Sequence, residues 1–130
     1  RLRPYLNKVL VPDFEGHCST EIFPIMVSEN VNKFFLFYWF LAPITVRKIN
    51  STWTGARMPR ANMNLVKSFK IPVPSLQIQK EIVETLDILD NHIQSVLLAY
   101  DEELKNLEEL KKSILQKAFS GELTNKNKAA

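Results

Sequence analysis

The sequence predicts an α+β protein in which a small head is followed by one long α-helix. Three observations lead to this fold class. Short aliphatic segments broken by proline lie near the start, an aromatic apolar run follows them, and apolar residues then recur every three or four positions through the second half. We therefore divide the chain into a head at residues 1–74, a spacer helix at 75–120 and a flexible tail at 121–130.

Two short strands are expected at the start of the head. Residues 7–12 (NKVLVP) have the aliphatic composition of a strand, which Pro12 and the polar run after it would end. Residues 21–27 (EIFPIMV) are the second candidate, and Pro24 favours an edge position or a bulge because proline cannot donate to a ladder.

An aromatic helix is expected after the second strand. Ser28 or Asn30 can serve as its N-cap, the apolar run covers residues 34–42, and the helix should stop near Pro43. This run is much shorter than the roughly twenty residues that span a bilayer. We therefore expect a buried core helix and no membrane contact.

The long helix is the clearest element. Ser75 is a plausible N-cap directly after Pro74, and Gly121 is a natural residue to end the helix. Apolar residues recur in steps of three and four, a coiled-coil spacing. The expected interface residues are Ile82, Leu86, Leu89, Ile93, Val96, Tyr100, Leu104, Leu107, Leu110 and Ile114.

This helix should need a partner. At about 1.5 Å per residue it would be roughly 66 Å long, far longer than the head. Ile88, Leu97, Leu98 and Leu115 widen the apolar surface beyond a two-stranded seam. Because large exposed apolar patches mark interfaces, we expect a second long helix or another subunit to cover it.

Charge is distributed unevenly between the two parts. Residues 1–74 carry ten Lys/Arg against four Asp/Glu, a net charge of +6, whereas residues 75–120 carry five against nine, a net charge of −4. This asymmetry favours a head that faces a polyanion and a helix that does not. Ordinary surface charge is the alternative explanation.

The most function-like stretch of the head is residues 46–65 (VRKINSTWTGARMPRANMNL). Arginine can contact phosphates or make paired hydrogen bonds to guanine, and Asn and Thr can bond to base edges. A solvated loop pinned by Trp53 and Met58 is the alternative. The candidate DNA-binding residues are Arg57, Arg60, Asn62 and Thr54, with Arg47 and Lys48 as phosphate contacts.

Catalytic and metal-binding patterns are not found in the sequence. There is no Gly-rich phosphate loop and no Cys/His cluster with metal spacing; His17 beside Cys18 is only a weak metal hint. A single cysteine allows no internal disulfide and nothing suggests an oxidising compartment, so a cytoplasmic protein is expected. The chain by itself is predicted not to be an enzyme.

One combination of motifs is specific. Residues 71–74 (IPVP) are followed by Leu76, Gln79 and a long helix that closes with ILQKAFSGEL at residues 114–123. Together with Gly55, Leu65 and the aromatic run, these features resemble the specificity (S) subunit of type I restriction-modification systems. The resemblance covers nearly the whole chain.

The resemblance implies a non-catalytic DNA sequence-specificity component. The head would be the C-terminal part of a target recognition domain that reads one half of a bipartite target in double-stranded DNA. The helix would be a spacer in an antiparallel coiled coil, with a helix of the same subunit or of a homodimer. It would also dock the modification (M) subunits, which use S-adenosylmethionine, while the restriction (R) subunits use ATP and Mg; this chain would hold no cofactor.

Two departures from the family pattern leave an alternative open. Ile78 stands where the family often has Glu, and residues 1–74 amount to about half of a usual recognition domain. Because only part of a recognition domain precedes the helix, we expect a fragment, a truncated product or half of a self-associating pair; the start at Arg1 suggests processing or a fragment. The alternative is a coiled-coil assembly half-subunit that does not bind DNA on its own.

The two prolines before the helix are expected to act as a hinge. Pro72 and Pro74 each fix φ and disfavour the α region for the residue before them, so the segment should stay extended. We expect this segment to set the orientation of the head relative to the helix.

Overall fold

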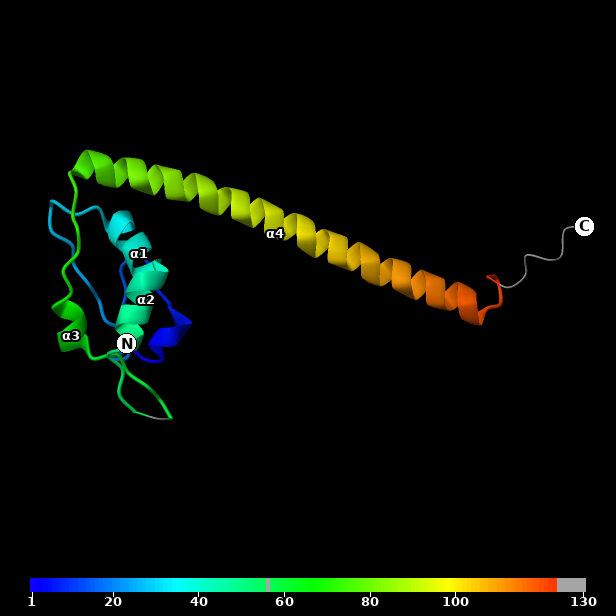
Figure 1. The fold of residues 1–130 in the computed structure, drawn as a ribbon, viewed down its shortest axis with the longest axis horizontal. Helices are drawn as coiled ribbons and strands as arrows, with labels where there is room; N and C mark the ends of the chain where they lie inside the picture. Colours follow the sequence, from blue (N-terminus) through cyan, green and yellow to red (C-terminus); the bar gives the residue numbers. More distant parts are fainter. Residues whose placement is uncertain (56, 124–130) are drawn as a thin grey trace, which may run out of the picture. The chain divides into compact units, whose positions relative to one another are not determined.

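The computed structural model describes residues 1–55 and 57–123. Two compact units divide at Asp87 and Ile88. The predicted tail falls largely outside the described residues, since residues 124–130 are not among them. In chain order the elements are η1 (Pro4–Leu6), α1 (Lys33–Leu41), α2 (Pro43–Asn50), α3 (Met63–Lys67) and α4 (Leu76–Phe119) (Figure 1).

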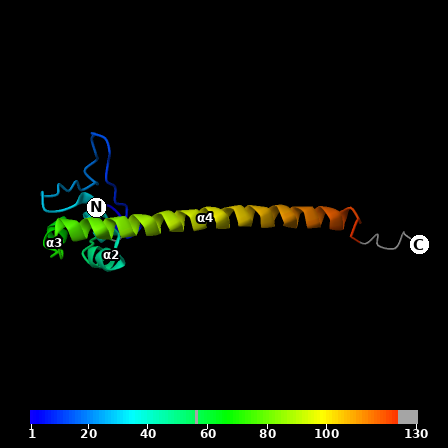
Figure 2. The same ribbon diagram turned by 90° about the horizontal axis from the view of Figure 1, so that it is seen from above.

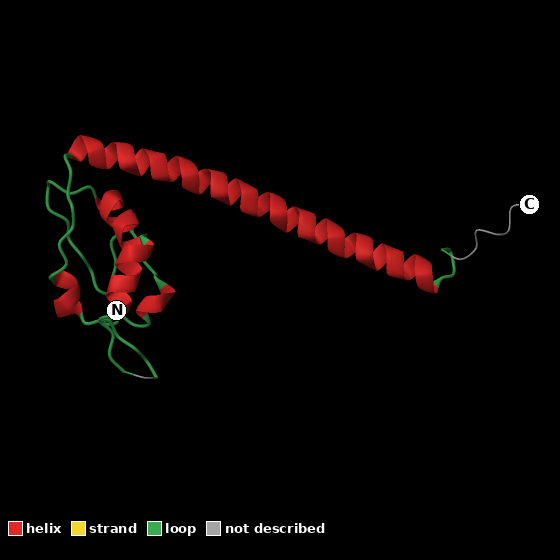
Figure 3. Ribbon diagram, viewed as in Figure 1, coloured by secondary structure: helices red, strands yellow, loops and turns green. Residues whose placement is uncertain are grey.

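Both predicted strands, and with them the α+β class, are wrong for the described residues. Figure 3 shows helices and loops there, and pairing is limited to the isolated bridges Leu2↔Arg60 and Thr54↔Arg60. A strand needs a neighbour for its backbone hydrogen bonds. Residues 7–12 and 21–27 meet none within the described chain, and Met26 is 97% exposed.

The aromatic helix is confirmed as α1, with a different cap. Asn32 is the N-cap instead of Ser28 or Asn30: its Oδ1 accepts hydrogen bonds from the backbone N–H groups of Phe34 (2.8 Å) and Phe35 (3.4 Å). Asparagine is among the best N-caps because its side chain satisfies free N–H groups of the first turn. Phe35 is the buried residue of this helix.

Pro43 ends one helix and begins another. Ala42 has an extended ψ of 132°, and Pro43 then occupies the first position of α2. Proline disfavours the α region for the residue before it but is well suited to the start of a helix. The predicted stop near Pro43 is therefore confirmed, while α2 itself was not predicted.

Unit 1 is organised around a small core. Phe35, Val66 and Ala61 are buried in the head, and so are Gln79 and Val83 from the first turns of α4. Contacts therefore place the beginning of α4 in the same compact unit as the head, although its sequence continues the periodicity of the long helix.

The predicted long helix is confirmed, together with both of its end signals. The Ser75 Oγ accepts a hydrogen bond from the Ile78 backbone N–H (3.4 Å), as an N-cap does. Gly121 has φ +78°, the left-handed conformation typical of the residue that closes a helix. Figure 2 shows α4 as one uninterrupted ribbon. The i,i+4 pair Asp101–Lys105 forms an ion pair of 2.6 Å.

The apolar stripe of α4 is largely uncovered. Leu86 is half-buried, and the other nine predicted interface residues are exposed in the structure. The stripe therefore exists as the sequence predicts. A coiled-coil partner for it stays a prediction.

Candidate nucleic-acid interface

The candidate DNA-binding residues centre on a hairpin loop of unit 1. Thr54 and Arg60 exchange two backbone hydrogen bonds of 3.1 Å, which close the loop between them. Gly55 supports the turn with φ +94°, a conformation that residues with a Cβ rarely adopt. Figure 1 shows this loop, in green, projecting from the head beside the N-terminus.

The N-terminal segment runs along one side of the hairpin. Arg3 N–H donates to the Pro59 carbonyl (2.8 Å), and Ala61 N–H donates to the Arg1 carbonyl (3.0 Å). This pairing brings two further exposed arginines, Arg1 and Arg3, to the loop. Sequence reasoning missed both, because nothing local in the sequence indicates this long-range pairing.

Arg60 is engaged by an acid from the second predicted strand. Its Nη2 lies 2.6 Å from Glu21 Oε1, and its Nε lies 3.1 Å from both carboxylate oxygens. The hydrogen bonds from Arg60 lower the pKa of Glu21 below its ordinary value, and Glu21 in turn raises the pKa of Arg60. The Arg60 guanidinium is therefore bound to a carboxylate of the protein itself.

Arg57 lies near the tip of the hairpin. It is exposed, and among the described residues the ion pairs involve Arg60 and Lys105 but not Arg57. Its guanidinium is therefore available to an external anion, whereas that of Arg60 must first leave Glu21.

Asn62 and Thr52 give the end of the hairpin a structural role. Asn62 is the N-cap of α3, with Oδ1 accepting from the N–H groups of Asn64 (3.1 Å) and Leu65 (3.4 Å). The Asn62 N–H donates to the Thr52 hydroxyl (3.2 Å), and that hydroxyl donates to the Ile49 carbonyl (2.7 Å). The hairpin is thereby fastened to the end of α2.

Arg47 and Lys48 lie in the last turn of α2, apart from the hairpin tip. Both are exposed, and cations at a helix C-terminus are favoured by the helix dipole. The Lys48 ammonium is 4.4 Å from the centre of the Phe69 ring, a cation–π geometry. Helix α2 packs on η1, where Tyr5 makes an edge contact with Trp53 (ring centres 6.3 Å apart).

The structure thus brings Thr54, Arg57 and Arg60 together in one loop and adds Arg1 and Arg3 beside it. Asn62 serves the fold, and Arg47 and Lys48 lie on a neighbouring helix. Such a group of cations and hydrogen-bonding side chains can hold phosphates and contact base edges. Which of these residues touch DNA stays a prediction.

The described residues offer neither a metal cluster nor a membrane-spanning helix. No group of three or more His, Cys, Asp or Glu side chains is close enough there to hold a metal ion. Within the same part of the chain, no helix has both the length and the apolar character that a membrane crossing requires.

The chain is similar to known proteins over most of its length. Residues 5–114 match the family model described as "Type I restriction modification DNA specificity domain". The chain is 32% identical to the type I restriction enzyme EcoDI specificity subunit of Escherichia coli over 95% of its own length and 28% of that protein. It is 29% identical to the MjaVIII specificity subunit of Methanocaldococcus jannaschii over 79% and 23% of the two chains.

A third relative is matched over a smaller share of the chain. The EcoBI specificity subunit of Escherichia coli is 33% identical over 69% of this chain and 19% of its own length. The chain therefore spans about a quarter of the length of the curated relatives that it matches. No solved structure matches it.

Proposed function

The chain belongs to the family of type I restriction modification DNA specificity domains, and from that premise we propose that it reads one half of a bipartite DNA target without catalysing a reaction. The observation that carries this proposal is the basic hairpin closed by Thr54 and Arg60, in which Arg57 is exposed and beside which Arg1 and Arg3 lie. The related specificity subunits support the same role.

Contact with DNA would combine two kinds of interaction. Cationic side chains hold phosphates and fix the position of a protein on the duplex, whereas bidentate arginines distinguish guanine in the major groove. Arg57 has no ion-pair partner among the described residues, so it can contact a phosphate or a guanine. To contact DNA, Arg60 would leave the Glu21 carboxylate for a phosphate or a base edge. The old and new partners are similar, because each is an anion or a hydrogen-bond acceptor for the guanidinium.

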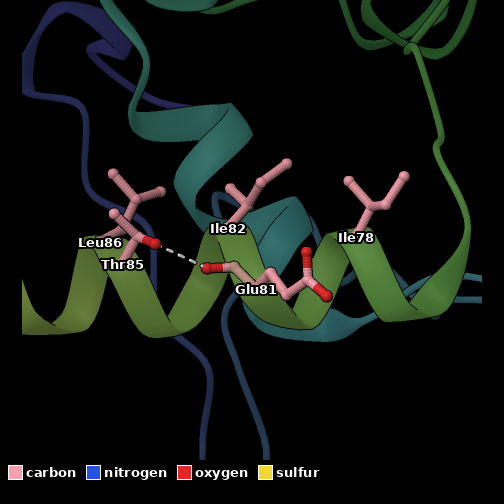
Figure 4. Close-up of a pocket in the computed structure, with 5 residues that line it drawn as sticks. All are labelled: Ile78, Glu81, Ile82, Thr85 and Leu86. Carbon is pink, nitrogen blue, oxygen red and sulfur yellow. Dashed lines mark hydrogen bonds between the residues drawn. The ribbon is translucent and has the colours of Figure 1, made fainter.

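Helix α4 would be the spacer and the docking surface for the modification subunits. Its exposed stripe fits an antiparallel helix, from the same subunit or from a second copy of the chain. In the first turns, Ile78, Ile82 and Leu86 point the same way and, with Glu81 and Thr85, line a shallow apolar groove (Figure 4). S-adenosylmethionine, ATP and Mg would belong to the partner subunits.

A second candidate function is favoured by the same exposed stripe. The chain would then be an assembly half-subunit, which associates through α4 but does not bind DNA on its own. A gel shift separates the two functions: the leading proposal expects the isolated chain to bind DNA in low salt, and the second expects binding only by the assembled complex. Low salt is specified because phosphate contacts weaken as salt rises.

The direct test reverses charge in the hairpin. Arg57→Glu should abolish DNA binding by the assembled complex while leaving helix association intact, because Arg57 has no ion-pair partner among the described residues. Lys80→Glu is the matched control, since it makes the same charge change at an exposed position of α4. Equal loss in both variants, or unchanged binding by Arg57→Glu, would remove the hairpin from the site.

Arg60 requires a different substitution experiment, because it is paired with Glu21. Reversing it alone would place two carboxylates together at Glu21, so a folding defect would imitate a loss of binding. The exchange Glu21→Arg with Arg60→Glu keeps the pair and moves the positive charge. If this double variant keeps its folded stability but loses DNA binding, Arg60 contacts DNA; full binding would exclude it.

A further inference from the structure

Gln79 is a fully buried polar residue in the first turn of α4, with a relative exposure of 0%. Its Oε1 accepts a hydrogen bond from the Asn32 N–H (2.7 Å), and its Nε2 donates to the carbonyls of Asn30 (3.0 Å) and Pro74 (2.8 Å). One carboxamide thus joins three stretches of backbone: the loop before α1, the segment before α4, and α4 itself.

Two further contacts continue from Gln79 along the same face of the helix. Val83, one turn later, is 7% exposed. One turn beyond it, Asp87 Oδ1 accepts a hydrogen bond of 2.5 Å from the Tyr38 hydroxyl of α1. Residues spaced by four lie on one side of a helix, so these residues form a strip of three successive turns. We call Gln79, Val83 and Asp87 the clamp strip.

The clamp strip fixes the direction of the first turns of α4 as well as their position. Apolar packing alone allows small rotations, whereas hydrogen bonds weaken steeply when they are misaligned. Any tilt of the first turns of α4 would strain these bonds and leave the polar atoms of the buried Gln79 carboxamide unpaired, which costs free energy. The fixed part lies entirely within unit 1, and α4 continues from it without interruption to Phe119.

We propose that Gln79 is a specificity-determining positioning residue: by locking the first three turns of α4 to the head, it sets the spacing between the two half-sites that the complex accepts. This inference rests on the proposed function. It assigns a role in spacing to a residue that is fully buried within unit 1. In this proposal the loop residues contact the bases, and the clamp strip sets the position at which the head holds the loop residues.

The test uses the complete specificity subunit that carries this chain, assembled with its modification subunits. Binding is measured on a set of duplexes in which the half-sites are fixed and the gap is varied one base pair at a time. Gln79→Met removes the hydrogen bonds at nearly constant volume. Gln77→Met is the matched control, because Gln77 is exposed in the same turn and its side chain binds only Glu81 among the described residues (2.9 Å).

The expected result is a loss of preference for one gap. In Gln79→Met, the affinity ratio between the native gap and gaps one base pair longer or shorter should fall by about tenfold, the size expected when the bonds of one buried group are lost. The preference for the half-site sequence should remain. Gln77→Met should retain the native ratio.

A second variant decides the case if Gln79→Met does not assemble. Asp87→Ala removes the acceptor for Tyr38 at the far end of the clamp strip, and Asp90→Ala is its control at an exposed position of the same helix. Asp87→Ala should reduce the preference for the native gap, whereas Asp90→Ala should leave it unchanged.

Two results would overturn the inference. One is an unchanged gap preference in a clamp variant that assembles; the other is a uniform loss of affinity at every gap, which a merely structural role would produce. Failure of the proposed function is recognised separately, since the unmodified complex would then show no dependence on the half-site sequence at any gap.

Discussion

Arg60 and Glu21 form a bidentate ion pair that holds the candidate hairpin to a segment 39 residues earlier in the chain. The Nη2–Oε1 distance is 2.6 Å, and both side chains are only partly exposed. The same guanidinium therefore has a structural partner and is also a candidate for contact with DNA. The stability of the loop and its binding activity should accordingly be linked through this pair.

We expect the pair to make stability depend on pH. The folded-state pKa of Glu21 is lowered, so its contribution is fully present above the unfolded value of 4.5 and is lost as pH falls through the lower folded value. Denaturant midpoints of the chain and of Glu21→Gln should therefore differ near pH 7 and converge as pH falls through the lowered folded-state pKa of Glu21. Glu15→Gln, at an exposed loop position, is the control. A difference that does not shrink as pH falls below 4.5 would contradict the assignment.

Gly55→Ala should loosen the hairpin. Gly55 has φ +94°, and an added Cβ would lie 3.5 Å from the Met58 carbonyl oxygen. The strain of a left-handed alanine is about 1 kcal/mol, so the Arg60 N–H, which is bonded to Thr54, should exchange with solvent about five times faster. Gly16→Ala should have little effect, because Gly16 lies outside the left-handed region. Equal exchange rates in both variants would count against the turn geometry.

Val83→Ala should destabilise unit 1. Val83 is 7% exposed, and removing its two methyl groups should lower the free energy of unfolding by about 2 kcal/mol. Val96→Ala is a close match, since it makes the same change in the same helix at a position that is 52% exposed. It should alter helix association instead. Chemical denaturation measures the first effect, and a larger loss from Val96→Ala would show that Val83 is not part of the core.

Leu107→Asp should prevent association through α4. Burying a leucine contributes about 1.5–3 kcal/mol, and an unpaired carboxylate at an interface adds a further penalty, so association should weaken by about a hundredfold. Leu98→Asp changes an exposed leucine off the main stripe and should weaken association far less. Sedimentation equilibrium provides the measurement. If the two variants associate equally, the predicted stripe is not the interface.

Changing Pro72 and Pro74 together to Ala tests the predicted hinge. The substitution frees the segment before α4, so target affinity or spacing fidelity of the assembled complex should fall. The Gln79 bond to the Pro74 carbonyl can survive this change, because alanine also has a carbonyl group. Restriction and methylation assays give the readout, with Pro12→Ala as the control. Normal activity of the double variant would contradict the predicted hinge.

Local signals were sufficient to predict α4. Its repeat of three and four residues extends over many turns, and the signals at Ser75 and Gly121 act on backbone groups within a few residues. The start of α1 was misplaced by two residues or more because Ser28, Asn30 and Asn32 are all good N-caps, and only the fold selects among them.

Non-local contacts explain what the sequence did not predict. Residues 7–12 and 21–27 have strand composition, but a strand forms only where a second one is available to pair with it. The Arg57 loop was identified from residue types alone, whereas the pairing of Arg60 with Glu21 spans 39 residues. Gln79 belongs to a recognised motif, but its burial depends on Asn30 and Asn32, 49 and 47 residues away.

The partners of Gln79 have a consequence for the exchange of heads between subunits. All three are main-chain atoms, of Asn30, Asn32 and Pro74, so the carboxamide recognises the path of the backbone and not the identity of the side chains. A head of different sequence could be grafted onto the same helix, provided that its loop before α1 follows the same course. Under the proposed function, such a graft would change the DNA specificity without redesign of the junction.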